Sequence, residues 1–290
     1  MSIALSGVSY TYMPGTPYSR DALRGIDLII EPGEFIGIIG HTGSGKSTLV
    51  QHLNGLLRPT KGVVQVDGND LHAKGAEKKR VRQRVGMVFQ YPEHQLFEES
   101  VFDDVAFGPR NLGLDADEVS QRVESALERV GLPASDYATR SPFRLSGGQM
   151  RRVAIAGVIA LQPEYLVLDE PSAGLDPRGR DEIFDQILQL YHSSGMAVVL
   201  VTHNMEDVAR LAKRLLVMNQ GRIEFDGKPT DLFRDETIPL HEFGISMPSV
   251  TSLLRTLRAK GLNVDDTLLD PEEVAGAIEV ALGQKRIGSC

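Results

Sequence analysis

The segment Gly40-His41-Thr42-Gly43-Ser44-Gly45-Lys46-Ser47 is a glycine-rich run that ends in lysine and serine. It follows the apolar run 35–39 and precedes the helical run 48–53, so it joins a strand to the start of a helix. Its glycines let the backbone bend and turn successive N–H groups inward, where they can surround the β- and γ-phosphates of a nucleotide. Lys46 adds a point charge, and the Ser47 hydroxyl can ligate magnesium. A turn that only connected a strand to a helix would not need this pair, so the segment predicts a phosphate-binding loop in an α/β fold.

Two carboxylates end a second apolar run. The stretch Leu166-Val167-Leu168-Asp169-Glu170 places both acids at the carboxyl end of a strand, which is where ligands bind in open α/β sheets. Asp169 can hold magnesium through water, and Glu170 is placed to orient or deprotonate an attacking water molecule. Two such acids on their own are as often merely solvated. Together with the phosphate loop, they predict nucleotide hydrolysis.

Charge and cysteine usage restrict the partners and the compartment. The 290 residues carry 31 basic against 39 acidic side chains, a formal net charge of -8, so we expect no nucleic acid as partner. The only cysteine is Cys290, which excludes an intrachain disulfide and favours a reducing, cytosolic compartment. The first residues lack a basic start before an apolar run, and no stretch of about 18 apolar residues follows. We expect a protein that is not exported and that reaches a membrane only through a partner.

Short apolar runs alternate with helical patterns along the chain, which is typical of an α/β core with a mixed or parallel sheet. Antiparallel strands are expected within 1–31 and at 63–66, and buried parallel strands at 35–39, 165–168 and 197–201. Helical periodicity predicts a helical subdomain, inserted at about 92–161. Prolines then divide short amphipathic segments from about residue 235. The expected organisation is a main domain at 1–234, with an N-terminal antiparallel β subdomain, and a small C-terminal domain at 235–290.

Leu145-Ser146-Gly147-Gly148-Gln149 opens another apolar-periodic helix, whose exposed start can offer N–H groups to phosphate. This pentapeptide is the signature of ATP-binding-cassette (ABC) ATPases, and the chain resembles that family over roughly residues 3–230. The resemblance implies ATP and Mg²⁺ as cofactors. It also implies a head-to-tail dimer, in which Ser146, Gly147, Gly148 and Gln149 of one chain close on ATP held by Gly40–Thr48 of the other.

Further positions take their roles from this resemblance alone. Gln90 matches the glutamine that reaches magnesium and senses the membrane partner, and Asp176 lies in the loop that links the two nucleotide sites. His203 matches the histidine that contacts the γ-phosphate. Tyr12 is spaced like the aromatic residue that stacks on adenine, although Tyr10 or Tyr18 could take that role.

The stretch 90–109 is similar to that of energy-coupling factor transporter ATPases, as are Ser141-Pro142-Phe143-Arg144 and the residues 150–157. Pro14-Gly15-Thr16-Pro17 looks like the second of the two paralogous ATPases of that group. The resemblance implies a peripheral protein at the cytoplasmic face of the cell membrane. Its expected partners are a second, paralogous ATPase, a membrane T component and, indirectly, interchangeable S components that capture vitamins or transition-metal ions. The alternative is the ATPase subunit of a conventional ABC importer.

Acidic residues after Gln90 surround an apolar centre, formed by Leu96, Phe97 and Phe102. The acids are Glu93, Glu98, Glu99, Asp103 and Asp104. Arginine pairs with carboxylates in a bidentate manner, so this stretch predicts a docking surface for a partner helix that carries arginines. A solvated helix face over core aromatics is the commoner fate of such a pattern.

Overall fold

The computed structural model describes residues 2–72, 81, 83–235 and 237–287, so Cys290 lies outside the described residues. The chain divides into two compact units, and each is described by itself. The first unit comprises Met1–Glu34 and Ser47–Val201, and the second comprises Phe35–Lys46 and Thr202–Cys290. The predicted boundary between 1–234 and 235–290 is a different division, and it stays a prediction.

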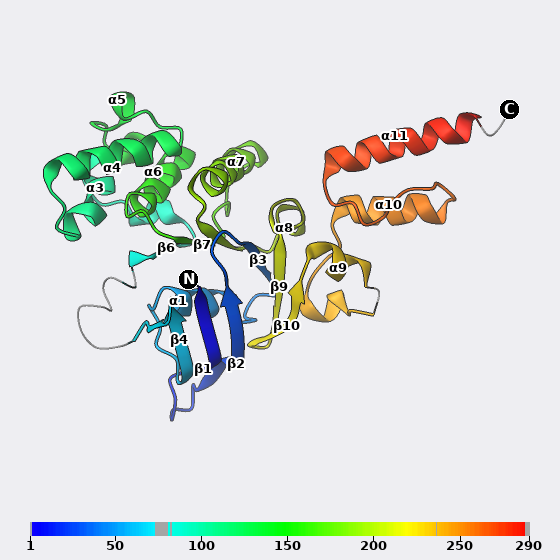
Figure 1. Cartoon of the computed structure of the whole chain (residues 1–290), viewed down its shortest axis with the longest axis horizontal. Helices are drawn as coiled ribbons and strands as arrows, with labels where there is room; N and C mark the ends of the chain where they lie inside the picture. Colours follow the sequence, from blue (N-terminus) through cyan, green and yellow to red (C-terminus); the bar gives the residue numbers. More distant parts are fainter. Residues whose placement is uncertain (1, 73–80, 82, 236, 288–290) are drawn as a thin grey trace. The chain divides into compact units, whose positions relative to one another are not determined.

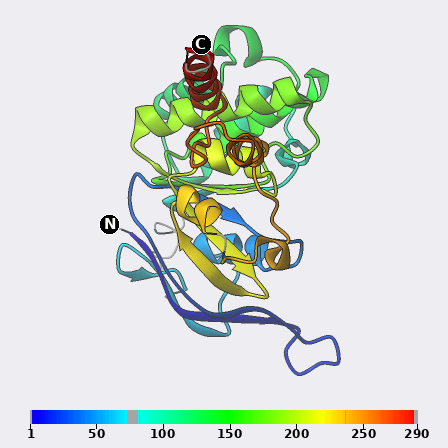
Figure 2. The same cartoon turned by 90° about the vertical axis from the view of Figure 1, so that its right-hand side faces the viewer.

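The first unit begins with an antiparallel sheet in the order β2-β1-β4-β5 (Figure 1). Its strands are β1 (Ile3–Tyr12), β2 (Arg20–Ile30), β4 (Lys61–Val66) and β5 (Asn69–Asp70). Residues Ile3, Leu5 and Val8 are buried while their neighbours are partly or fully exposed, so one face of the sheet packs inward. Residues 13–19 form the loop at the end of the long β1–β2 hairpin (Figure 2). The antiparallel N-terminal strands were therefore predicted correctly.

Three parallel strands follow in the same unit. They are β6 (Val85–Val88), β7 (Tyr165–Asp169) and β8 (Ala197–Val201), with β7 between the other two. Every residue of these strands is buried, which explains their near-continuous apolar sequences. Helix α7 (Pro177–Ser194) connects β7 to β8 and ends at Gly195, whose φ of 68° supplies the left-handed turn after the helix.

A helical subdomain is inserted between β6 and β7 (Figure 1). It contains the 3-10 turns η1 (Pro92–Gln95) and η2 (Pro142–Arg144), and the helices α3 (Val101–Asn111), α4 (Ala116–Arg129), α5 (Ala134–Tyr137) and α6 (Gly147–Ile159). Ser100, Asp115 and Ser146 cap the three longer helices with side-chain oxygens. This confirms the expected helical insert.

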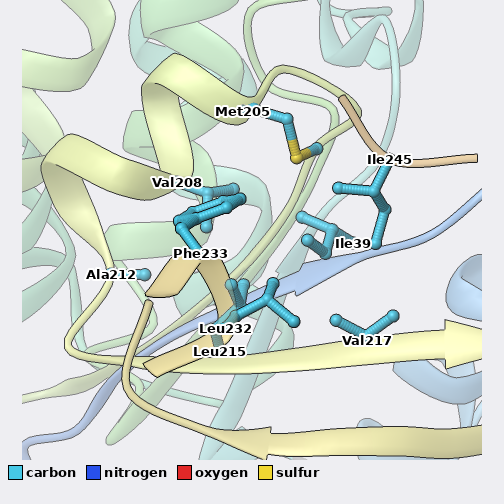
Figure 3. Close-up of a cluster of buried hydrophobic side chains, with 9 residues drawn as sticks. All are labelled: Ile39, Met205, Val208, Ala212, Leu215, Val217, Leu232, Phe233 and Ile245. Carbon is cyan, nitrogen blue, oxygen red and sulfur yellow. The ribbon is translucent and has the colours of Figure 1, made fainter. Parts of the chain in front are cut away.

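The second unit has β9 (Arg214–Asn219) between parallel β3 (Phe35–Ile39) and antiparallel β10 (Arg222–Gly227). Helix α8 (Met205–Leu211) and helix α9 (Pro229–Arg234) pack on these strands. Their buried side chains form the cluster of Figure 3, which brings Val208, Leu232 and Phe233 together with Leu215 of β9. The same cluster includes Ile245, which follows the 3-10 turn η3 (Leu240–Phe243).

Two further helices end the described part of the second unit. Helix α10 (Ser249–Ala259) packs on α11 (Pro271–Ile287) around a separate apolar cluster that contains Leu254, Leu262 and Val274. These helices lie within 235–290, the segment that composition predicts to be a small C-terminal domain, and that division stays a prediction.

Candidate functional site

The glycine-rich loop lies between β3 and α1 (Lys46–Leu53). Gly40 has a φ of 145°, and a side chain there would collide with the carbonyl oxygen of Met218 and approach Ser44 Oγ. The Lys46 ammonium donates to the carbonyl oxygens of Gly40 at 2.7 Å and His41 at 3.0 Å. Ser44 Oγ is buried and has no hydrogen-bond partner within the described residues. The loop therefore presents a lysine, a buried hydroxyl and a glycine cradle in the form that phosphate binding requires.

Residues from later in the chain hold the outer side of this loop. The His41 N–H donates to the carbonyl oxygen of Phe243 in η3 at 3.1 Å, and His41 Nε2 lies 3.1 Å from Asn219 Oδ1. The Gly221 N–H donates to the Ser44 carbonyl oxygen at 2.9 Å. The β9–β10 turn and η3 thus fix the loop, and both anchors escaped the sequence analysis because neither belongs to a local motif.

The first unit contributes the residues that follow the loop. Ser47 is exposed and Thr48 is buried, and the Tyr12 hydroxyl lies 3.1 Å from Thr48 Oγ1. The Tyr10 ring packs edge-on between the rings of Tyr12 and His52. Tyr18 is 80% exposed in the hairpin loop, whereas Tyr12 is 38% exposed. Of the three candidate tyrosines, Tyr12 combines contact with α1 and an accessible ring.

The two acids predicted at a strand end differ in their surroundings. Asp169 ends β7 and is only 7% exposed, whereas Glu170 is half-buried. Glu170 adopts a left-handed backbone with a φ of 52°, which is uncommon for a residue other than glycine. Its N–H donates to the Val201 carbonyl oxygen at 2.9 Å, and its own carbonyl accepts the N–H of Ala173 at 3.1 Å. The backbone at the predicted catalytic position is therefore held in a defined, sparsely populated conformation.

The signature pentapeptide starts helix α6. Ser146 and Gln149 form a reciprocal capping box, in which each side chain accepts the backbone N–H of the other residue. The Gln149 side chain also donates to the Tyr137 hydroxyl at 3.2 Å. Gly147 and Gly148, the first two helical residues, leave open space where a Cβ would be. Their N–H groups lack intrahelical acceptors, so the helix start can receive an anion.

The remaining predicted residues lie at the ends of elements. Gln90 is exposed and follows β6, directly before Tyr91, whose backbone is left-handed. Asp176 caps α7 by accepting the Gly179 N–H at 2.7 Å. His203 is exposed two residues after β8 and belongs to the second unit, while the two acids belong to the first.

Arg151 is the main residue of this region that the sequence analysis missed. Its side chain is 2% exposed and forms two hydrogen bonds with the Glu93 carboxylate, at 2.7 and 3.0 Å. It also donates to the carbonyl oxygens of Pro171 and Ala173, both at 2.9 Å. Arg151 shares a buried side of α6 with Ile155 and Ile159, four and eight positions later, and a charge at that apolar spacing was the signal available in the sequence.

The predicted acidic rim is partly wrong. Glu93 is turned inward to Arg151, Asp103 pairs with Arg110 at 2.9 Å, and Asp104 accepts the N–H groups of Phe97 and Glu98. Burial raises the pKa of Asp104 against the effect of these N–H groups, while the Ser100 hydroxyl and Arg110 lower the pKa of Asp103. These acids stabilise the subdomain itself. Glu98 and Glu99 remain as candidates for the rim.

An exposed aromatic pair includes Phe97, which directly precedes these two glutamates in the sequence. The rings of Phe97 and Phe107 meet edge-on with centroids 5.0 Å apart, and the residues are 57% and 47% exposed. Phe102, in contrast, is half-buried, with Arg110 over its ring. The apolar centre of the predicted surface is therefore Phe97 with Phe107.

Across the described ranges, no helix is long and apolar enough to cross a membrane.

Comparison with known proteins places these features in a family. The family model described as "ABC transporter" matches residues 23–173. The chain is 50% identical over 278 residues to the energy-coupling factor transporter ATP-binding protein EcfA2 of Clostridium perfringens, covering 96% of this chain and 97% of that protein. It is 52% identical over 286 residues to the EcfA2 of Symbiobacterium thermophilum, covering 99% of this chain and 98% of that protein.

A solved structure supports the same assignment. The cbiO1 protein of Clostridium perfringens, described as part of the ABC transporter complex cbiONQ, matches with a TM-score of 0.73 and 36% identity, covering 87% of this chain and 98% of its own. The shared fold has an antiparallel N-terminal sheet, a mixed core sheet and a helical insert. The chain therefore belongs to the ABC transporter ATPases, which hydrolyse ATP to drive transport, and among them to the energy-coupling factor transporter ATP-binding proteins.

Proposed function

We propose that this chain binds ATP with Mg²⁺ at the loop 40–48 and hydrolyses it with Glu170 as general base, in a dimer that powers uptake through membrane components. The observation that carries the proposal is the glycine loop, in which Gly40 tolerates no side chain and Lys46 points onto the loop's own carbonyl oxygens. Such an ammonium can turn to the β- and γ-phosphates at little cost, because it leaves two neutral acceptors for charged ones. The N–H groups of 43–48 and the buried Ser44 hydroxyl add further donors.

The residues proposed to bind magnesium carry suitable oxygen donors. Ser47, Asp169 and Gln90 offer a hydroxyl, a carboxylate and an amide oxygen, which are the ligands that this hard cation prefers. They would hold the ion, which neutralises phosphate charge when bound. Asp169 is 7% exposed at the end of β7, so its carboxylate extends from a fixed place on the strand.

Hydrolysis requires a base that is fixed in place. The Glu170 backbone is held by its hydrogen bond to the Val201 carbonyl and by the turn to Ala173. The side chain therefore extends from a fixed backbone position, from which its carboxylate can orient and deprotonate water. His203 is proposed to contact the γ-phosphate, and Tyr12 to stack on adenine with its hydroxyl near Thr48. Asp176 is proposed to lie in the loop that links the two sites, and its carboxylate supports the shape of that loop by capping α7.

Dimerisation completes each site in this proposal. Ser146, Gly147, Gly148 and Gln149 present a capped helix start that can receive the γ-phosphate of ATP on a second cassette. The cassette MJ0796, whose structure is described as a dimeric post-hydrolysis state bound to ADP and Pi, matches this chain with a TM-score of 0.68 and 29% identity, covering 78% of this chain and 98% of its own. We propose a paralogous cassette as the second subunit.

The membrane side of the proposal concerns Phe97 and Phe107 with Glu98 and Glu99. An exposed aromatic pair beside two carboxylates suits a partner helix that combines apolar residues with arginine. We propose that a T component docks here, that the chain is peripheral at the cytoplasmic face, and that S components deliver vitamins or other micronutrients. The transported compound is then selected by a different subunit.

Two variants test the chemistry in the complete transporter in proteoliposomes. The partner cassette carries glutamine in place of its own catalytic glutamate, so that turnover reports this chain's site. Lys46→Ala should weaken ATP binding about 10- to 100-fold, because it removes charge-assisted hydrogen bonds of about 1.5–3 kcal/mol each. Glu170→Gln should keep ATP affinity and lower turnover by a factor of about 100 or more. Turnover at the wild-type rate in Glu170→Gln would exclude Glu170 as the base.

A further inference from the structure

The Arg151 side chain connects two separate segments of the first unit. Its Nε and Nη2 donate to the two oxygens of Glu93 in η1, while its Nη1 donates to the carbonyl oxygens of Pro171 and Ala173. All four distances lie between 2.7 and 3.0 Å. The planar guanidinium can serve these directions at once, whereas the point charge of a lysine cannot.

Both ends of this connection lie at functional positions. Pro171 and Ala173 follow Glu170, and the Ala173 N–H closes a turn onto the Glu170 carbonyl at 3.1 Å. Glu93 lies in η1, close after Gln90 and shortly before Phe97. Next to it, Tyr91 stacks on His94 and lies 3.4 Å from where a Cβ on Gly174 would be. The segment after Gln90 and the segment after Glu170 are thus packed together, with Arg151 as their charged link.

The electrostatics of this link favour a fixed geometry. Burial raises the pKa of the Glu93 carboxyl, but the hydrogen bonds and charge of Arg151 outweigh burial and hold the pKa below its usual value. Glu93 is therefore ionised at neutral pH, and neither partner can be displaced without leaving a buried charge unpaired. The Glu170 backbone, with its φ of 52°, needs neighbours that hold it, and Arg151 binds the two carbonyl groups that follow it.

We propose that Arg151 is a positioning residue that fixes the Glu170 backbone through the carbonyl groups of Pro171 and Ala173, and that Glu93 transmits displacements of η1 to it. This inference rests on the proposed role of Glu170 as the base. A partner that moves η1 pulls on the Glu93 carboxylate, which shifts the guanidinium and hence the peptide after Glu170. Docking and hydrolysis are then coupled within one unit, without a contact between the partner and the nucleotide.

The test uses the complete transporter with the partner cassette described above. Arg151→Met alone would strand the Glu93 charge, so the main variant is Arg151→Met with Glu93→Leu, which removes both charges together. We expect a native melting temperature, an ATP KM within about twofold of wild type and a kcat at least about tenfold lower, because small displacements of a catalytic group cost up to about 100-fold. Arg151→Lys should recover part of the kcat, since it restores one donor to the carbonyl groups.

A matched pair on the same subdomain serves as control. Arg122 and Glu118 on α4 pair at 2.6 Å, and Arg122 is 17% exposed. Arg122→Met with Glu118→Leu should keep both kcat and KM. If Arg151→Met with Glu93→Leu keeps kcat within twofold while Glu170→Gln is inactive, the inference about Arg151 is wrong although the proposed function stands. If Glu170→Gln is active, the proposed function fails, and the inference fails with it.

Discussion

Tyr12 combines an accessible ring with a contact to helix α1. Tyr12 has a ring that is 38% exposed and a hydroxyl 3.1 Å from Thr48. Tyr12→Ala should weaken ATP binding by about 1–3 kcal/mol, or roughly 5- to 150-fold in Kd, because it removes the ring proposed to stack on adenine. Tyr12→Phe keeps the ring and should cost at most about threefold. Equilibrium titration with ATP measures both.

Tyr18→Ala provides the comparison for this experiment. Tyr18 is 80% exposed in the hairpin loop, so its removal changes little in the folded chain. We expect a wild-type Kd for Tyr18→Ala. A larger loss there than in Tyr12→Ala would transfer the adenine contact to the hairpin loop and exclude the proposed role of Tyr12.

At the scale of residues, sequence reasoning succeeds where function is encoded in contiguous motifs. The need for glycine at position 40 follows from the loop pattern, and the structure explains it by the crowding of Met218. Glu93 shows where such reasoning ends. Its acidic neighbours suggested a surface, but its carboxylate binds Arg151 from a distant helix. A partner that lies 58 positions away cannot be inferred from the local charge pattern.

The start of helix α6 has a structural and a proposed functional role. Ser146→Ala removes the cap and should cost about 1 kcal/mol of stability. In the proposed dimer it should also lower hydrolysis at the partner's phosphate loop, while the ATP affinity of this chain's own loop stays unchanged. Equilibrium ATP binding and turnover, measured on one preparation, separate the two effects.

Helix α4 offers a matched control for the cap. Asp115 caps it by accepting the Glu118 N–H at 2.9 Å. Asp115→Ala should cost a similar stability and leave hydrolysis unchanged, because this helix start has no proposed nucleotide contact. An equal loss of turnover in both variants would mean that Ser146 acts through helix stability alone.

Helix α1 carries a buried histidine, His52, which makes the stability of the folded chain depend on pH. Burial lowers the pKa of His52 below 6.5, with the charge of His72 adding to it and the hydrogen bond to the Thr48 carbonyl opposing it. The unfolded chain therefore binds a proton more readily than the native one. Stability that is present above pH 6.5 is lost as the pH falls from there towards the native pKa. In urea unfolding from about pH 7.5 to 5.5, His52→Gln should lose less stability than the wild type.

An exposed histidine provides the control for this dependence of stability on pH. His241 lies exposed in η3. His241→Gln controls for the replacement of an exposed histidine and is measured over the same pH range. If His52→Gln shows the wild-type dependence of stability on pH, the loss of stability arises from other groups, and the buried imidazole is not its source.

At the scale of elements, the sequence predicted what repeats locally and missed what depends on distant contacts. Buried parallel strands such as β7 and β8 were recognisable because both of their faces are covered, so every position is apolar. The hydrogen bond from the His41 N–H to the Phe243 carbonyl was not, since backbone groups carry no sequence signal. Composition alone marked the C-terminal segment as an appendage, yet it touches the phosphate loop.

For the whole molecule, a docking surface should couple ATP hydrolysis to transport. A variant of that surface should therefore separate the two activities. Glu98 and Glu99 directly follow Phe97 of the exposed Phe97–Phe107 pair, while Asp103 is bound to Arg110 and is unsuitable for a charge-reversal test. Glu98→Lys with Glu99→Lys would place positive charges against the arginines proposed on the partner helix. We expect substrate uptake by reconstituted vesicles to fall at least about tenfold, since lost or reversed interfacial charge pairs cost about 2–5 kcal/mol.

The same double variant should leave the chemistry of the cassettes intact, because no residue of the proposed nucleotide site is changed. ATP turnover of the isolated pair of cassettes, measured without the membrane components, should stay within about twofold of wild type. Glu128→Lys, an exposed acid on α4 of the same subdomain, should affect neither uptake nor turnover. Unchanged uptake in the double variant would exclude this surface as the docking site. A parallel fall in the turnover of the isolated pair would instead show that the glutamates support the cassette itself, because a surface used only for docking has no effect until the membrane partner is present.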